Sequence, residues 1–191
     1  MVGAILTQQT SWKNVEKAII NLKERESLSP FFLRDIPLEE LQEVIRPSGF
    51  YVAKAATLKR FVEFFFEAYG ASIDKMKQFD TNVLRNELLK IKGIGRETAD
   101  SVILYAMDKP IFPVDNYTKR IYLRTGISSS TDYEELRQIT EQALQTQNFV
   151  SDLKEFHALL VKLGKDFCKK IPKCELCPIN NNCIKKGVKY E

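Results

Sequence analysis

The stretch from Leu88 to Asp115 constrains the fold more than any other part of this 191-residue chain. Apolar residues recur at helical spacing before and after a turn that contains Gly93 and Gly95, which predicts a helix, a tight turn and a second helix. Because the second helix begins just after Gly95, its free N–H groups can bind a phosphate anion without a side-chain charge. Two glycines alone more often mark an ordinary interhelical turn than a phosphate-binding site. The longer sequence pattern is needed to distinguish the two.

One carboxylate, Asp115, follows the second helix behind Pro110 and Pro113. Asp is also favoured as the N-cap of a helix, and such a cap would fix the position of the carboxylate. A fixed carboxylate can stabilise a developing positive charge and can orient or deprotonate a water molecule. A backbone phosphate anchor followed by one fixed carboxylate indicates an enzyme that acts on nucleic acid.

The hydrophobic periodicity predicts an all-α protein, because no segment alternates with the strand period for long. We expect two helical lobes with the active site between them. A helical bundle over residues 11–107 contains the hairpin, and residues 1–10 and 108–191 form a terminal lobe with C-terminal helices and a cysteine loop. The single histidine, His157, lies on an apolar helical face and is expected to be a hydrogen-bonded core residue.

The composition predicts a soluble, globular and intracellular protein of the cytoplasm or nucleoid. No apolar run approaches the length of a membrane span, and the N-terminus lacks a signal-peptide layout. The net charge of +4 is compatible with DNA binding, although many proteins that do not bind DNA share it.

All four cysteines lie within sixteen residues near the C-terminus, with intervening lengths of five, two and five: Cys168, Cys174, Cys177 and Cys183. Such clustering favours a metal centre over disulfides spread through the chain. Tetrahedral zinc and a [4Fe–4S] cluster both accept four cysteines, and the spacing does not decide between them.

The longer pattern L-x-x-I-x-G-I-G-x-x-T-A-D-x-V, followed by P-x-x-x-V-D, resembles the helix-hairpin-helix DNA glycosylases of the endonuclease III superfamily. The segment C-E-L-C-P-I-N-N-N-C is similar to the iron–sulfur loop of that superfamily, so the resemblance implies a [4Fe–4S] cluster, with zinc as the alternative. It also implies that Asp115 is the catalytic carboxylate, because Val114-Asp115 matches the family motif.

Position 97 bears on the reaction type. The resemblance implies that members with lyase activity carry a lysine two places after the second hairpin glycine, where its amine forms a Schiff base. This chain has Glu97 there, and the neighbouring Arg96 stays protonated. We therefore expect a monofunctional glycosylase of the 3-methyladenine type, with Glu97 as a second catalytic residue and an alkylated purine as the base.

The remaining expected contacts come from the resemblance in the case of Gln8 and from residue type and position in the other cases. Gln8 would fill the gap left by the extruded base, and Trp12 would contribute a ring to the base pocket, although a lone Trp near a helix start more often packs in the core. Besides Gln8, six residues are expected to bind DNA: Lys92, Gly93, Ile94, Gly95, Arg96 and Lys119.

The expected partner is double-stranded DNA with a damaged base, bound by a monomer and without a membrane. Two other functions stay open at this point. One is a bifunctional glycosylase and lyase that acts on oxidised pyrimidines or mismatches. The other is a DNA-binding module without enzymatic activity.

Overall fold

The computed structural model describes residues 1–25 and 28–188, and it contains helices and no strand in these ranges. The expected all-α fold is thereby confirmed. The contacts divide the chain into two units, Met1–Asp108 and Lys109–Glu191, and each unit is described by itself.

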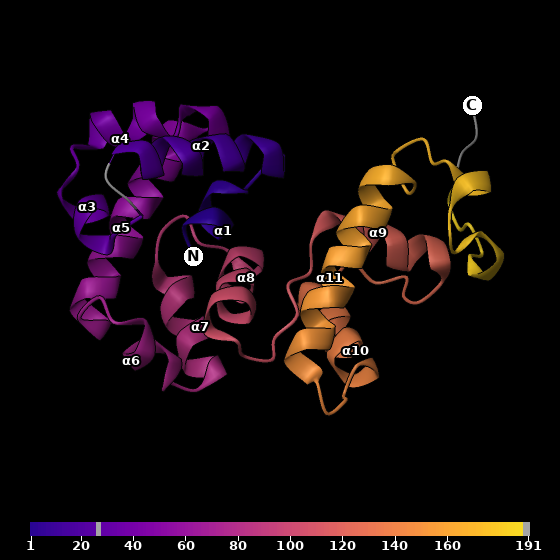
Figure 1. Cartoon of the computed structure of the whole chain (residues 1–191). Helices are drawn as coiled ribbons and strands as arrows, with labels where there is room; N and C mark the ends of the chain where they lie inside the picture. Colours follow the sequence, from indigo (N-terminus) through magenta and orange to yellow (C-terminus); the bar gives the residue numbers. More distant parts are fainter. Residues whose placement is uncertain (26–27, 189–191) are drawn as a thin grey trace. The chain divides into compact units, whose positions relative to one another are not determined.

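The first unit is built around its longest helix, α5 (Tyr51–Tyr69), which packs against α1, α3, α4 and α6 (Figure 1). The helix α7 pairs with α8 to form the hairpin. The other helices of this unit are α1 (Val2–Leu6), α2 (Trp12–Arg25), α3 (Pro30–Asp35), α4 (Leu38–Val44), the 3-10 helix η1 (Arg46–Ser48), α6 (Ile73–Lys77), α7 (Thr81–Lys90) and α8 (Arg96–Met107).

The sequence sets both ends of α5 and its buried face. Phe50 and Gly70 flank the helix in the left-handed conformation, which ends helical geometry at low cost for glycine. Apolar residues at helical spacing then point into the core, among them Leu58, Phe61 and Phe65, each at most 3% exposed. Burial of one such side chain stabilises the fold by about 1.5–3 kcal/mol.

Residues 1–10 belong to the first unit, whereas the sequence analysis assigned them to the terminal lobe. Helix α1 packs against α5 and α8, and Ile5 and Leu6 are completely buried. The buried ammonium group of Lys54 on α5 also donates to Leu6 O at 2.9 Å and to Ser48 O at 2.6 Å. A short apolar helix has little preference of its own, so tertiary packing decides its place.

The second unit contains α9 (Asn116–Thr125), α10 (Tyr133–Ala143), α11 (Phe149–Asp166) and the 3-10 helices η2 (Cys174–Leu176) and η3 (Asn180–Asn182). Helices α9 and α11 make its most extensive contact. They approach closely at Gly164, where an added Cβ would lie 2.2 Å from the ring of Tyr117. Helix α10 joins them through the buried hydroxyls of Tyr122 and Thr140, which lie 2.6 Å apart.

None of the helices in the described ranges is both long enough and apolar enough to span a membrane.

Candidate active site

The hairpin turn, residues 92–95, lies between α7 and α8 and packs directly on α5. Gly93 has a φ of +103°, and an added Cβ would lie 2.1 Å from Thr57 Oγ1. Gly95 is the N-cap of α8 and has no side chain to accept hydrogen bonds from the first N–H groups of that helix. Those N–H groups, together with the positive end of the helix dipole, form a suitable site for a phosphate oxygen.

The residues predicted to bind DNA at this turn differ in their exposure. Lys92, Gly93, Gly95 and Arg96 are exposed, as a contact surface requires. Ile94 is buried, with 5% of its surface exposed. The side chain of Ile94 therefore anchors the turn in the core, and only its backbone is available to a ligand.

Charged side chains hold the hairpin in one conformation. Arg60 on α5 donates to Lys92 O at 2.9 Å. Within the hairpin, the guanidinium of Arg85 donates to both carboxylate oxygens of Asp100, at 2.7 Å and 3.2 Å. Asp100 is completely buried, and such a bidentate pair fixes orientation as well as distance.

The segment after α1 presents two glutamines that differ in their surroundings. The amide of Gln8 donates to Gly93 O and to Thr98 Oγ1, both at 3.0 Å. Gln9 is exposed and has a left-handed backbone with a φ of 52°. The structure thus places the side chain of Gln8 against the hairpin and leaves Gln9 on the surface.

The other predicted residues of the first unit occupy its surface. Glu97 is exposed in the first turn of α8, where the helix dipole favours a carboxylate. Trp12 begins α2 with 47% of its surface exposed, and its ring lies against Gly3, whose added Cβ would meet Trp12 Cη2 at 3.2 Å. Trp12 is therefore partly a packing residue of α1 and α2.

Asp115 is the N-cap of α9 in the second unit, as its residue type predicts. Its Oδ1 accepts from the backbone N–H of Thr118 at 2.7 Å and from the hydroxyl of the same residue at 2.9 Å. Asp115 is only 8% exposed. The capping contacts use one carboxylate oxygen and fix the plane of the group, while the second oxygen faces another neighbour. Lys119, on the next turn of α9, is half-buried.

Helix α10 holds the extended segment that leads to Asp115. The backbone N–H of Phe112 donates to Glu141 Oε1 at 2.8 Å, and that of Val114 donates to the hydroxyl of Tyr133 at 3.2 Å. Arg137 in turn pairs with the carboxylate of Glu141 at 2.8 Å. Side chains thus satisfy the backbone of this buried segment, and the position of the following carboxylate is fixed from both sides.

The second carboxylate oxygen of Asp115 faces His157 on α11. The distance between His157 Nε2 and Asp115 Oδ2 is 3.8 Å. Burial lowers the pKa of His157 below its ordinary value, and the negative charge of Asp115 acts in the opposite direction. The imidazole is therefore neutral at physiological pH.

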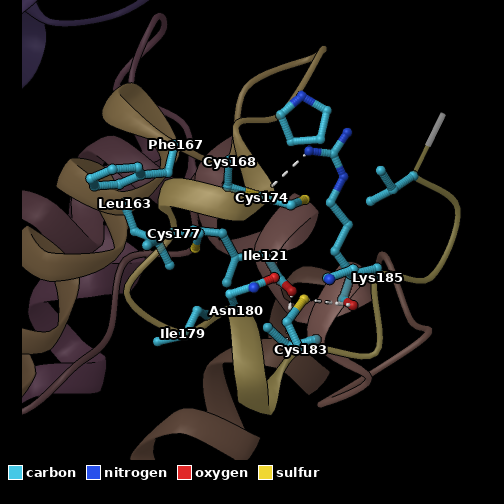
Figure 2. A pocket seen from close by; sticks show the side chains of 14 residues that line it. Ile121, Leu163, Phe167, Cys168, Cys174, Cys177, Ile179, Asn180, Cys183 and Lys185 are labelled. Carbon is cyan, nitrogen blue, oxygen red and sulfur yellow. Dashed lines mark hydrogen bonds between the residues drawn. The ribbon is translucent and has the colours of Figure 1, made fainter. Parts of the chain in front are cut away.

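The four cysteines line one pocket in the second unit, together with apolar side chains that include Ile121, Leu163 and Phe167 (Figure 2). All four are free thiols that no disulfide joins. Four thiols around a pocket with apolar walls are a donor set that fits a metal centre.

Two arginines of α9 hold the chain around this pocket. Arg120 donates through Nε to Cys168 O at 2.7 Å. Arg124 donates to Cys168 Sγ at 3.4 Å and to the carbonyl of Lys170 at 3.1 Å. These contacts from α9 fix the backbone after Cys168 and one sulfur at the wall of the pocket.

The comparisons with known proteins identify the family. Residues 2–146 match the model of the HhH-GPD superfamily, base excision DNA repair proteins. The chain belongs to the HhH-GPD superfamily. The resemblance inferred from the hairpin and Val114-Asp115 is thereby confirmed, and the function that the comparisons support is that of a base-excision repair DNA glycosylase.

Relatives within the superfamily cover nearly the whole chain. A protein of Methanocaldococcus jannaschii named as a candidate DNA repair glycosylase is 47% identical over 97% of this chain and 84% of its own length. The endonuclease III of Thermotoga maritima is 31% identical over 96% of this chain and 80% of its own.

Two solved structures show the same fold. The 3-methyladenine DNA glycosylase of Helicobacter pylori, bound to 1,N6-ethenoadenine, has a TM-score of 0.78 and 30% identity, and the match covers 86% of this chain and 82% of the other. A trapped covalent complex of endonuclease III with DNA has a TM-score of 0.79 and 25% identity, and the match covers 96% of this chain and 81% of the other.

The sequence analysis did not single out Gln9, and it did not pair His157 with Asp115. Gln9 differs from Gln8 in its exposure and in its left-handed backbone, and its residue type predicts neither. His157 does carry a signal, because it lies four residues after Leu153 and three before Leu160, both buried. That spacing places it on the inner face of α11, but the sequence does not reveal that this face meets Asp115.

The hairpin turn provides a first test. Gly93→Ala adds a Cβ to a left-handed residue and forces it against Thr57, so the free energy of unfolding should fall by about 3 kcal/mol. Gly95→Ala is the matched control, because no atom lies within 4 Å of its added Cβ, and it should cost about 1 kcal/mol or less. Urea unfolding without DNA measures both. Equal losses would contradict the packing of the turn on α5.

Proposed function

We propose that the chain hydrolyses the N-glycosidic bond of an alkylated purine and leaves an abasic site without cutting the strand. The observation that carries this proposal is Glu97, exposed in the first turn of α8, at the position where the resemblance places a Schiff-base lysine in lyase members. A carboxylate does not form a Schiff base with the sugar. The 30% identity to a 3-methyladenine DNA glycosylase supports the choice of base.

Asp115 supplies the chemistry of bond cleavage in this proposal. Departure of the base gives the deoxyribose oxocarbenium character, and a nearby carboxylate stabilises that positive charge. Because the capping contacts use Oδ1, Oδ2 is the oxygen that faces the sugar or the attacking water. An alkylated purine already carries positive charge and leaves readily, so a strong acid on the base is not required.

The first unit supplies the contacts to DNA. The N–H groups at the start of α8 bind a backbone phosphate, and the exposed Lys92 and Arg96 add charge to the same contact. We assign the gap-filling role to Gln9 in place of Gln8, because Gln9 is exposed while the amide of Gln8 is hydrogen-bonded to the hairpin. Phe50, 66% exposed before α5, is a second side chain suited to stack on bases.

The remaining predicted residues have supporting roles. Lys119 on α9 is a phosphate contact. Glu97 contacts the base or the water, and the exposed part of Trp12 stacks on a cationic base. These three assignments rest on residue type and exposure.

We propose a [4Fe–4S] cluster for the cysteine pocket, held by Cys168, Cys174, Cys177 and Cys183. The four free thiols line one pocket with apolar walls, and four cysteines suit either a [4Fe–4S] cluster or zinc. The resemblance of the segment C-E-L-C-P-I-N-N-N-C to the iron–sulfur loop of the superfamily supports the cluster.

A second candidate function is that of a bifunctional glycosylase and lyase. The 31% identity to an endonuclease III and the likeness to a trapped covalent complex favour it. It would require an amine other than residue 97 to attack the sugar, and the covalent product could be trapped with borohydride.

The reaction is tested by base release from duplexes that contain 3-methyladenine, 7-methylguanine, hypoxanthine, thymine opposite guanine, or an oxidised pyrimidine. We expect release of an alkylated purine, with strand breaks only after hot alkali. Asp115→Asn keeps a good helix cap, so it should fold normally and lose activity by a factor of about 100 or more.

Two outcomes would contradict the proposal. Strand breaks without alkali, together with a borohydride-trapped complex, would establish the lyase. Release that survives Asp115→Asn would remove the carboxylate from the mechanism. Lys13→Ala, an exposed substitution on α2, is the control for nonspecific effects of substitution.

The cofactor is tested by metal analysis of protein purified without oxygen. We expect about four irons and the visible absorption of an iron–sulfur cluster, both lost in Cys177→Ser and retained in the neighbouring control Lys173→Ala. One zinc per chain without visible absorption would contradict the cluster and establish the alternative.

A further inference from the structure

The single histidine of the chain occupies a place that packing alone would give to an apolar residue. His157 lies on the buried face of α11 between Leu153 and Leu160, and its ring meets that of Phe112 edge to face at 5.8 Å. A buried imidazole loses hydration that a leucine would not need. Its Nε2 lies 3.8 Å from Asp115 Oδ2, the carboxylate oxygen that the helix cap does not use.

We propose that His157 is a positioning residue for Asp115: its Nε2–H holds Oδ2 as Thr118 holds Oδ1. This inference rests on the proposed function of Asp115. The separation of 3.8 Å exceeds that of a direct hydrogen bond. Contacts of this kind are often long in a free enzyme and shorten when substrate binds.

The neighbours of the pair explain why the imidazole stays neutral. From α9, Thr118 contributes uncharged donors to Asp115. From α10, the hydroxyl of Tyr133 and the carboxylate of Glu141 face the backbone of the preceding segment, and Glu141 is itself paired with Arg137. The charge of Asp115 acts on the imidazole, and burial outweighs it.

The pH dependence has a definite sign. Burial lowers the pKa of His157 below its ordinary value of 6.5. The imidazole is therefore mostly neutral at pH 6.5 and becomes protonated only at lower pH. An imidazolium beside Asp115 would cancel part of the charge that stabilises the sugar cation. The rate of base release should therefore fall on acidification as the imidazole of His157 becomes protonated.

Two variants separate positioning from packing. His157→Gln keeps an amide donor and does not titrate, whereas His157→Leu keeps the volume and has no donor. In single-turnover base release, we expect His157→Leu to lower the rate by about 10- to 100-fold with unchanged affinity for undamaged duplex. His157→Gln should retain most of the rate at neutral pH and lose the part of the acid-side fall that protonation of His157 causes, because its amide does not titrate.

An activity-independent measurement tests the contact itself. The chain has one histidine, so NMR titration reports His157 without assignment problems. Because the charge of Asp115 raises the pKa of His157, Asp115→Asn should lower it further. An unchanged pKa in Asp115→Asn, or wild-type rates and pH profiles in both His157 variants, would overturn the proposal. Absence of base release from wild type would instead contradict the proposed function, while the titration would still decide the contact.

Discussion

The helix cap made by Asp115 is the interaction on which the proposed chemistry depends. Two donors of Thr118 bind one carboxylate oxygen, and the plane of the group is thereby fixed. A capping hydrogen bond usually contributes about 1 kcal/mol to stability. Here the same contact also orients the carboxylate, so Oδ2 has a defined direction before any substrate binds. Electrostatic stabilisation of a transition state requires such a group, fixed in advance.

In the first unit, several contacts fix the hairpin turn and with it the backbone N–H groups at the start of α8. Gly93 lets the hairpin turn lie against Thr57, the buried pair of Arg85 and Asp100 holds α7 to α8, and Gln8 bonds the turn from the segment after α1. Each contact restrains the turn from a different element. The N–H groups at the start of α8 are therefore arranged in advance for an anion. In the proposed reaction, this part of the molecule binds DNA and Asp115 supplies the charge.

The sequence analysis predicted the features that depend on neighbouring residues. Asp115 caps a helix, as its residue type predicts, and the expected helix, turn and helix around Gly93 and Gly95 form α7, the turn and α8. The sequence analysis did not predict contacts between residues that are far apart in the sequence. Gln8 meets a residue 85 positions away in the sequence, α1 gains its place from α5 and α8, and His157 meets Asp115 across two helices. The roles of these residues come from tertiary packing, which periodicity does not specify.

The most direct test of the central claim compares two abasic-site analogues in the same duplex, a cationic pyrrolidine and a neutral tetrahydrofuran. A carboxylate that stabilises a sugar cation should make wild-type protein bind the pyrrolidine duplex about 100-fold more tightly or better. In Asp115→Asn that preference should largely disappear while binding to the tetrahydrofuran duplex is retained. An equal preference in wild type and Asp115→Asn would show that Asp115 does not supply the charge, and would contradict the account.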